Sequence, residues 1–425
     1  MAKSIISPSD VEVEQITLYT PNGKVFDISD LVIEINIYED LFSPMLTADM
    51  MVVDAAGLFA NTPILGQEKI TGLILRGDTL EEFEFRCTGV EGITGQNDYT
   101  LSYKFNLVEE SYYRNCTTLI SQSFEGRISD IITTIANDFL DEDIEVEETV
   151  GNFKFVIPNW SPYRTIRWLL RRAHNKNNVP MVCYKTLYDG LQLKSLESLF
   201  EQSTTHIFYD RKKDIGNQLT DKDQYLAYYQ TANELSQNKI GSVSEYLKAG
   251  AYGSRTQLVD TMNKHYDIFD YNYKDQFDRT SHLEKAKTIS NNFLVNDKSV
   301  FDYPSTTQKN FVHSEESFGD SHMDYNGDVL NSSPYLVSYF RTMSFVEYYL
   351  MISGRMNIGV GSLIDLKLNK NMPLTSNQMS EVEDKRRSGK HIITGLRHKF
   401  DSNRQYNIII NAARDTMGAE YNETI

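Results

Sequence analysis

The stretch that decides the fold is LVIEINIY, residues 31–38. Every odd position carries leucine or isoleucine, and the even positions carry Val32, Glu34, Asn36 and Tyr38. A period of two with one mostly apolar face is typical of a strand that is buried on one side. We therefore expect this part of the chain to form a β-sheet.

The neighbouring sequence predicts further strands joined by short turns. Ile16–Tyr19 and Lys24–Ile28 flank Pro21-Asn22-Gly23, and an Asn-Gly pair tolerates the positive φ angles that a tight hairpin needs. The other expected strands are 45–53, 69–76, 82–90 and 100–108. Sequential strands with short turns predict an antiparallel barrel or sandwich.

The pattern changes to helical spacing after residue 110. Within 127–140 the apolar residues form one stripe, at positions 128, 131, 132, 135, 136, 139 and 140. Ser161 as N-cap and Pro162 at the first helical position predict a second helix that runs to about His174. With strands expected at 181–185 and 190–194, this segment predicts a small α/β domain.

The last part of the chain returns to β patterns. The expected strands are 346–352, 362–368, 390–398 and 406–411, and a polar loop is expected at 374–388. Residues 281–294 predict a helix, followed by a loop-rich region at 302–332. Two β-rich segments near the two ends thus bracket an α/β middle.

Composition excludes several classes of protein. The chain has 425 residues, of which 40% are apolar and 24% charged, so it can fill ordinary cores, and the length favours about three domains. The net charge of −17 argues against a general nucleic-acid binder, which gains its affinity by neutralising phosphates. No apolar run approaches the length of a membrane span, and no export signal is expected.

A search for metal and nucleotide motifs finds no complete match. There is no phosphate-binding loop and no H-E-x-x-H, and Gly359-Val-Gly361 lacks a third glycine. The densest set of potential metal ligands is His313, Glu315, Glu316, Asp320, His322, Asp324 and Asp328. A calcium loop would require an acid where Ser333 stands, so a solvated acidic loop without metal is the favoured interpretation.

Carboxylate pairs and cysteines also yield no catalytic site. A phage-type lysozyme spacing, Glu-x8-Asp-x5-Thr, is half matched by Glu201 with Asp210 and by Glu315 with Asp324, but Gly216 and Leu330 replace the threonine. The three cysteines, Cys87, Cys116 and Cys183, are too far apart for a zinc motif and are expected to be reduced thiols. We therefore expect no catalytic residue, no metal and no cofactor.

One basic cluster stands out from the acidic background. It consists of Arg164, Arg167, Arg171, Arg172 and Lys176. The first three are spaced i, i+3 and i+7, so they share one face of the expected helix. This pattern is compatible with a binding site for an acidic surface and with a solvent-exposed helix face. The solvent-exposed face is the favoured interpretation.

Several stretches, taken in order, resemble the baseplate hub proteins of contractile-tailed bacteriophages. The segments that carry the resemblance are 37–50 (IYEDLFSPMLTADM), 63–70 (PILGQEKI), 125–132 (EGRISDII), 160–173 (WSPYRTIRWLLRRA), Asp189-Gly190, 195–200 (SLESLF), 251–254 (AYGS) and 388–398 (SGKHIITGLRH). Together they span most of the chain. Residues 302–332 match no pattern of that family.

The resemblance implies an α+β, β-rich fold with two tube-protein-like antiparallel β-barrel domains. An inserted small α/β domain and a helix/loop insertion complete it. The expected domains are 1–110 (first tail-tube-like barrel), 111–215 (small α/β domain), 216–280 with 340–425 (second barrel) and 281–339 (helix/loop insertion).

The function that the resemblance implies is that of a structural virion protein rather than an enzyme. A homotrimeric hub would present a pseudo-sixfold ring between the hexameric tail tube and the trimeric central spike, and its channel would serve genome ejection. Expected partners are the spike protein, the tail tube or tube initiator protein, baseplate wedge or inner-baseplate proteins, and DNA that passes without specific binding. The expected place is the tail baseplate of the virion, assembled in the host cytoplasm, with no membrane contact.

Two other functions remain open at this point. The chain is also similar to the hub part of type VI secretion spikes and of phage-derived injection particles, where the cargo is protein. A tail-associated peptidoglycan hydrolase is the enzymatic alternative. For a genome channel, we expect carboxylates to line the bore, with Arg164, Arg167 and Arg171 on outer or partner-facing surfaces.

Overall fold

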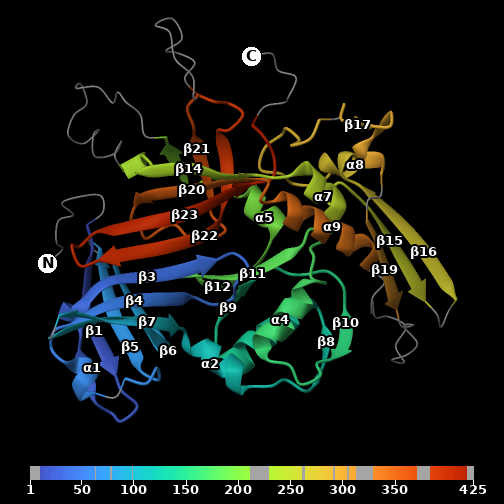
Figure 1. Cartoon of the computed structure of the whole chain (residues 1–425). Coiled ribbons are helices and arrows are strands. Elements are labelled where there is room, and N and C mark those ends of the chain that lie inside the picture. The colour runs from blue at the N-terminus through green and yellow to red at the C-terminus, as the bar shows by residue number, and fades with distance from the viewer. Residues whose placement is uncertain are drawn as a thin grey trace, which may run out of the picture.

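The computed structural model describes residues 10–62, 64–76, 79–97, 99–210, 229–260, 264–290, 292–303, 306–312, 329–370 and 383–418. Its dominant feature is a sheet of 13 strands, to which both ends of the chain contribute (Figure 1). The N-terminal strands are β1 (Glu12–Tyr19), β2 (Val25–Asp27), β3 (Val32–Asp40), β4 (Thr47–Asp54), β5 (Lys69–Arg76), β6 (Thr79–Asn97) and β7 (Thr100–Val108). The C-terminal strands are β13 (His206–Tyr209), β14 (Glu234–Ile240), β20 (Val346–Ser353), β21 (Leu363–Lys367), β22 (Gly389–Asp401) and β23 (Tyr406–Arg414).

The two groups of strands meet at the pair β3–β22. This pair is antiparallel, and its register runs from Gly395 opposite Asp40 to Asp401 opposite Glu34. The strand order is β14-β20-β23-β22-β3-β4-β7-β6-β5-β1-β2, with β13 and β21 joined to β22 at the side. The sequence predicted two barrels, whereas the described strands form one continuous sheet that does not close into a barrel. Backbone pairing across β3–β22 fuses the two β-rich segments.

The motif at 31–38 forms β3, with one deviation from strict alternation. Ile35 and Ile37 are buried as predicted, but Ile33 is 38% exposed. The register between β3 and β4 shifts between Val32 and Glu34, so Ile33 is the extra residue of a bulge. The predicted Asn22-Gly23 hairpin is confirmed, because β1 pairs with β2 and Gly23 has φ +80°.

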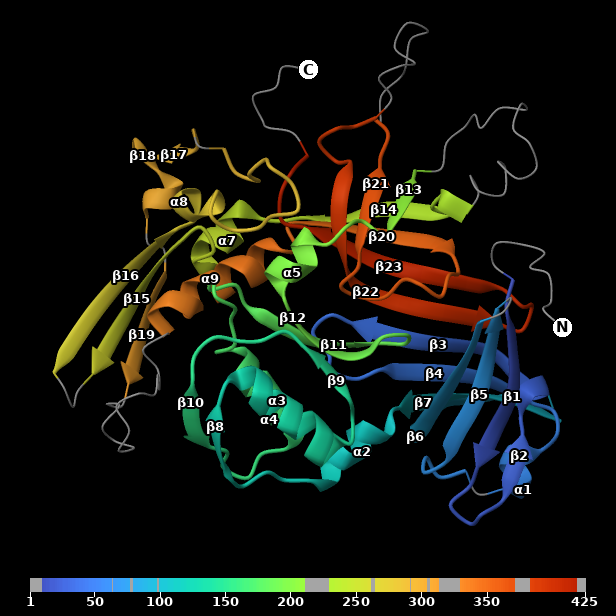
Figure 2. The ribbon, with the colours of Figure 1, turned by 180° about the vertical axis from the view of Figure 1, so that it is seen from behind.

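The middle of the chain forms short helices and two small sheets, most of which lie below the C-terminal strands and beside the N-terminal strands of the large sheet in Figure 1. The helices are α2 (Glu110–Thr117), α3 (Ile128–Ile135), a π-helical turn (Ala136–Leu140), α4 (Pro162–Leu170) and α5 (Leu196–Glu201). β9 (Ile144–Val146), β11 (Met181–Thr186) and β12 (Gly190–Ser195) form one sheet, and β8 (Ser123–Gly126) and β10 (Phe153–Val156) form the other. The predicted helical stripe of 128–140 packs into a separate apolar core. β11 also contacts β3, on the side that Figure 2 shows.

The predicted helix starting at Pro162 is confirmed as α4, but it ends at Leu170 instead of about His174.

Two predictions further along were wrong. The described residues of 281–294 are not helical: Ala286 N–H, which a helix would bond to the carbonyl of His282, bonds instead to the carbonyl of Met417. Leu283 N–H bonds to Asp415 and Glu284 N–H to Thr416. The described part of the expected loop 302–332 contains a strand, β19, and the start of a helix, α9. β19 pairs in parallel with β15, a partner far away in the sequence, so no local signal could reveal it.

The remaining elements lie beside the large sheet at one end (Figures 1 and 2). They are α7 (Val243–Ala249), β15 (Gly253–Asp260), β16 (His265–Asn272), α8 (Tyr273–Phe277), β17 (Leu294–Val295), β18 (Lys298–Ser299), β19 (Thr306–Val312) and α9 (Val329–Thr342). Short helical turns also occur at α1 (Leu58–Asn61), η1 (Ser29–Leu31) and η3 (Val300–Asp302). Most of the predicted polar loop at 374–388 lies outside the described residues.

The packing of the C-terminal strands predicts that Gly354 cannot be replaced by alanine without strain. A Cβ atom there would lie 2.1 Å from two atoms of the Tyr406 ring, which is fully buried. We expect Gly354→Ala to lower the free energy of unfolding by about 1–3 kcal/mol, seen as a lower midpoint of thermal unfolding. Gly89→Ala, in β6, is the matched control, since a Cβ there meets no heavy atom within 4 Å. Equal midpoints for the two variants would contradict the close packing of Tyr406 on Gly354.

Candidate functional site

The two halves of the large sheet are tied by one buried carboxylate, that of Glu39 on β3, which is 2% exposed. Its Oε1 accepts the backbone N–H of Leu187 at 2.7 Å and lies 3.0 Å from Nε2 of His398. Its Oε2 accepts the backbone N–H of Val360 at 2.9 Å. Glu39 therefore joins β3 to β22, to the turn between β11 and β12, and to the segment before β21.

The hydrogen bonds continue from His398 into the last strand. Nδ1 of His398 lies 2.7 Å from the hydroxyl of Tyr406, and that hydroxyl donates to the carbonyl of Arg355 at 3.0 Å. Burial raises the pKa of Tyr406 well above its ordinary value, so the hydroxyl keeps its proton. The hydroxyl of Tyr406 thus links the imidazole of His398 to the backbone at Arg355. All groups of this network are paired inside the fold, as a structural tie requires.

A second tie holds the small α/β segment against the first half of the chain. The ammonium of Lys185 lies 2.6 Å from the carboxylate of Glu109 and 2.7 Å from that of Glu142. Burial acts to lower the pKa of Lys185, but the two carboxylates outweigh it and raise the pKa above its ordinary value. Glu109 also accepts the backbone N–H of Leu46 at 2.8 Å. These contacts join the start of α2, the end of β11 and the start of β4.

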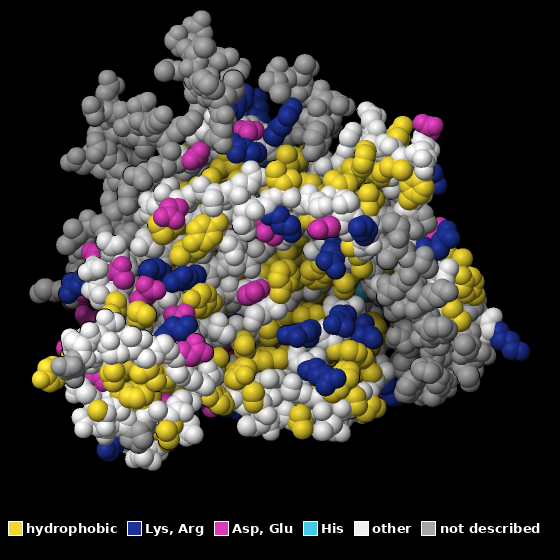
Figure 3. All heavy atoms as spheres, viewed as in Figure 1, with side chains coloured by type: hydrophobic (Ala, Val, Ile, Leu, Met, Phe, Trp, Pro, Cys, Tyr) yellow, Lys and Arg dark blue, Asp and Glu magenta, His cyan; other side chains and the backbone are white. Residues whose placement is uncertain are grey.

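The opposite face of β3 and its neighbours is open and carries charges of both signs. Glu34 lies 3.0 Å from Arg397 and 2.8 Å from Lys399, both on β22. Burial acts to raise the pKa of Glu34, but Lys399, Asn36 and Arg397 outweigh it and hold the pKa below its ordinary value. Beside this cluster is an open groove of about 520 Å³, lined by Tyr38, Asp40, Ser43, Met45, Thr47, Tyr349, Arg397, Ile409 and Asn411 among others. Figure 3 shows acidic and basic side chains interspersed over these strands.

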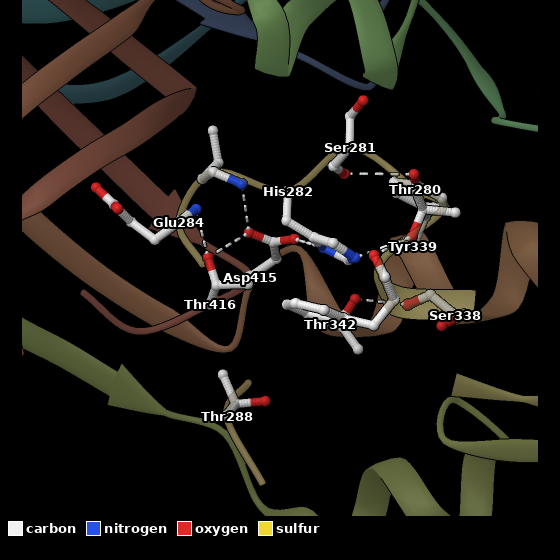
Figure 4. A network of polar contacts seen from close by, with 12 residues as sticks. Thr280, Ser281, His282, Glu284, Thr288, Ser338, Tyr339, Thr342, Asp415 and Thr416 are labelled. Carbon is white, nitrogen blue, oxygen red and sulfur yellow. Dashed lines mark hydrogen bonds and ion pairs between the residues drawn. The ribbon is translucent and has the colours of Figure 1, made fainter. Parts of the chain in front are cut away.

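A third polar network, drawn in Figure 4, has the outline of a hydrolase triad. Nδ1 of His282 lies 2.5 Å from Asp415, and its Nε2 lies 2.9 Å from the hydroxyl of Thr280. In a nucleophilic triad, the hydroxyl must donate to the imidazole. Here the Thr280 hydroxyl donates to the carbonyls of Gln276 (3.1 Å) and Phe277 (3.3 Å) at the end of α8. The Thr280 hydroxyl is thus held by the backbone at the end of α8, and the contact between His282 and Asp415 fastens this segment to the residues after β23.

The sequence candidates for catalysis and metal binding are dispersed or lie outside the described residues. The acidic set from His313 to Asp328 lies outside them, as does the pair Glu315–Asp324. Glu201, in α5, accepts a hydrogen bond from Ser281 at 2.7 Å, and the N–H of Asp210 bonds to the carbonyl of Lys367 in the adjacent β21. Among the described ranges, no group of three or more His, Cys, Asp or Glu side chains could hold a metal ion. Within the same ranges, no helix is long and apolar enough to span a membrane.

The three cysteines are free thiols, as predicted. Cys87 and Cys183 are buried and Cys116 is exposed. Burial raises the pKa of both Cys87 and Cys183 to about 12. Since the thiolate is the reactive form, these two are inert core residues.

The structure places the basic cluster as the spacing predicted. Arg164, Arg167 and Arg171 are exposed on one side of α4, and Lys176 is exposed beyond it. The side chain of Arg172 is only partly exposed. Its guanidinium lies 4.0 Å from the centre of the Trp168 ring, and burial lowers the pKa of Arg172. Figure 3 shows basic and apolar side chains gathered in this region.

Sequence reasoning missed Glu39, which links three distant parts of the chain. A signal was present, because alternation through Ile35 and Ile37 places Glu39 on the buried face of β3. An acid at the end of an apolar face predicts a buried carboxylate in need of partners. Those partners, at Leu187, Val360 and His398, are distant in sequence, so their identity could not be read from the strand.

The fold is that of phage tail proteins of known structure. Neither a protein-family model nor the sequence of a curated protein matches the chain. A tail protein from Neisseria meningitidis MC58 superposes with a TM-score of 0.53 at 7% identity, covering 94% of this chain and 96% of that one. The 43 kDa tail protein of prophage MuSo2 from Shewanella oneidensis gives 0.51 at 10% identity, covering 95% and 99%. An E. coli component of the type VI secretion system gives 0.43 at 9% identity, covering 95% and 76%.

The network around Glu39 predicts unequal effects for two substitutions on the same strand. Glu39→Gln leaves only one acceptor oxygen for two backbone N–H groups and His398, so we expect a loss of ~3–5 kcal/mol in the free energy of unfolding. Glu34→Gln, on the open face, should cost less than about 1 kcal/mol. Thermal unfolding of the two variants measures the difference. A Glu39→Gln protein as stable as Glu34→Gln would show that the buried network does not hold the halves together.

Proposed function

We propose that this chain is a structural virion protein, a trimeric baseplate hub of a contractile tail. It would form a pseudo-sixfold adaptor between the hexameric tail tube and the trimeric central spike. The observation that carries the proposal is the β3–β22 pairing, which sets two β-rich segments side by side in one chain. Three copies then supply six such units, which is the match between sixfold and threefold symmetry that an adaptor needs. The likeness to tail proteins in fold supports it.

The proposed division of the chain follows the sequence prediction. Residues 1–110 would be the first tail-tube-like unit, and 216–280 with 340–425 the second. The small α/β domain would be 111–215, and 281–339 would be the insertion. In this proposal, each β-rich unit completes its curved wall with the units of neighbouring protomers, which would account for a sheet that stays open in one chain.

The open face of the sheet is our proposed border of the channel for genome ejection. Its charges are paired, as in Glu34 with Arg397 and Lys399, so the face offers little free positive potential to bind phosphates. DNA could pass such a wall without specific binding. The proposed partners are the spike, the tube or tube initiator, and the wedge or inner-baseplate proteins, all in the tail baseplate. A hub of a protein-injecting particle would have the same architecture, and neighbouring capsid and terminase genes distinguish the two.

Multi-angle light scattering tests the assembly. We expect purified chain at micromolar concentration to have three times the monomer mass of 48.9 kDa by itself, and that mass plus the mass of the spike when the spike partner is bound. A protein that stays monomeric under both conditions would refute the trimeric hub.

The proposal also holds that the chain has no wall-degrading activity. We expect no clearing in a peptidoglycan zymogram with the purified protein, with a phage lysozyme as positive control. Clearing that disappears in a folded Glu or Asp variant would instead assign a hydrolase.

A further inference from the structure

The exposed arginines of the α/β segment differ in whether they are paired. Arg114 lies 2.7 Å from Asp141, and Arg127 lies 2.7 Å from Glu148. For Arg164, Arg167 and Arg171, no ion pair occurs among the parts of the chain that the structure describes. Three exposed, unbalanced cations on one helix face of a chain with net charge −17 form a local positive site.

Aromatic rings support one of these arginines, Arg164, and the neighbouring Arg172. The guanidinium of Arg164 lies 4.6 Å from the centre of the Trp160 ring, and that of Arg172 lies 4.0 Å from the Trp168 ring. The two indole rings contact each other edge to face at 5.7 Å, and Phe155 packs on Trp168 at 5.1 Å. Stacking engages the flat face of a guanidinium and leaves its N–H edge available to an oxyanion. The rings thus hold the donors in place before a partner arrives.

The surroundings of the face favour a carboxylate-bearing protein over a phosphate polymer. Leu119, next to the Ile120–Trp160 bridge, is 57% exposed. An exposed apolar group beside tryptophan and arginine is the composition of protein–protein contact centres.

We propose that this face, formed by Trp160, Arg164, Arg167 and Arg171, docks an acidic amphipathic helix of a partner protein. Arg171 keeps helical backbone angles (φ −69°, ψ −10°), so the three arginines follow one line. They are spaced about 4.5 and 10.5 Å along the axis. Glutamates at i, i+3 and i+7 of a partner helix repeat that spacing, and its apolar residues cover Leu119. The inference goes beyond the hub function, since it assigns a partner surface and the chemistry of its partner.

The chain carries its own reporter for this contact. Trp160 and Trp168 are its only tryptophans. Trp160 belongs to the face, and Trp168 contacts it edge to face. The probe is a synthetic helical peptide with glutamates at i, i+3 and i+7 and leucines between them. We expect it to change the tryptophan emission of the full-length protein in a saturable, salt-sensitive way. The same peptide with glutamine for glutamate should have no effect at equal concentration.

Matched variants separate a specific dock from general charge attraction. Arg167→Gln with Arg171→Gln should weaken peptide binding about tenfold, because two charge-assisted contacts are lost. Arg114→Gln with Arg127→Gln removes the same charge from arginines that are already paired, and should leave binding within about twofold. Circular dichroism and light scattering on the same samples check that folding and assembly are unchanged.

Three outcomes would overturn the proposal. They are no saturable response to the glutamate peptide, equal weakening by the two double variants, or tighter binding to single-stranded DNA or to vesicles of phosphatidylglycerol and phosphatidylcholine in equal parts. The light-scattering mass keeps this result separate from the hub assignment. A trimer that fails to bind the peptide rejects only the dock, and a monomer that binds it rejects only the trimeric hub.

Discussion

The arrangement of this molecule depends on the need of one buried carboxylate for partners. Glu39 sits at the end of the apolar face of β3, where an unpaired charge would be costly. Its two oxygens are satisfied only when the turn at Leu187, the segment at Val360 and the side chain of His398 are all in place. These groups come from three distant parts of the chain. Satisfying Glu39 therefore couples the first β segment, the α/β middle and the last β segment into one unit.

Side chains also hold the parts of the chain that lack regular structure. Asp415 accepts from the backbone of Leu283 and contacts His282, and the hydroxyl of Thr416 accepts from the N–H of Glu284. Together with the backbone pairing of Ala286 and Met417, these bonds fasten 281–286 to the residues that follow β23. The outline of a catalytic triad at Thr280 has the same origin, since the hydroxyl ends α8 and the imidazole supports it. Polar chemistry here serves positioning, which agrees with the structural role we propose.

Two surfaces of the protein differ in how their charged side chains are paired. On the open face of the sheet, acids and bases alternate and neutralise one another, as at Glu34 and Arg397. On α4, arginines rest on tryptophans, with no acidic partner among the described residues. A channel wall with paired charges does not bind a passing polyanion, whereas a surface that binds an acidic protein needs unpaired positive charges. The fold thus offers one surface suited to passage and one suited to attachment.

The sequence by itself determined most elements and the facing of their side chains. Alternation in 31–38, the Asn22-Gly23 turn, the stripe of 128–140 and the start at Pro162 are local patterns, and each formed as predicted except for the bulge at Ile33. The i, i+3, i+7 spacing likewise placed the three arginines on one exposed face. Tertiary structure alone decided that the β segments fuse through β3–β22, that 281–294 is not helical, and which groups satisfy Glu39. The reason is physical: periodicity records which side of an element avoids water, whereas strand pairing and buried hydrogen bonds depend on partners hundreds of residues away.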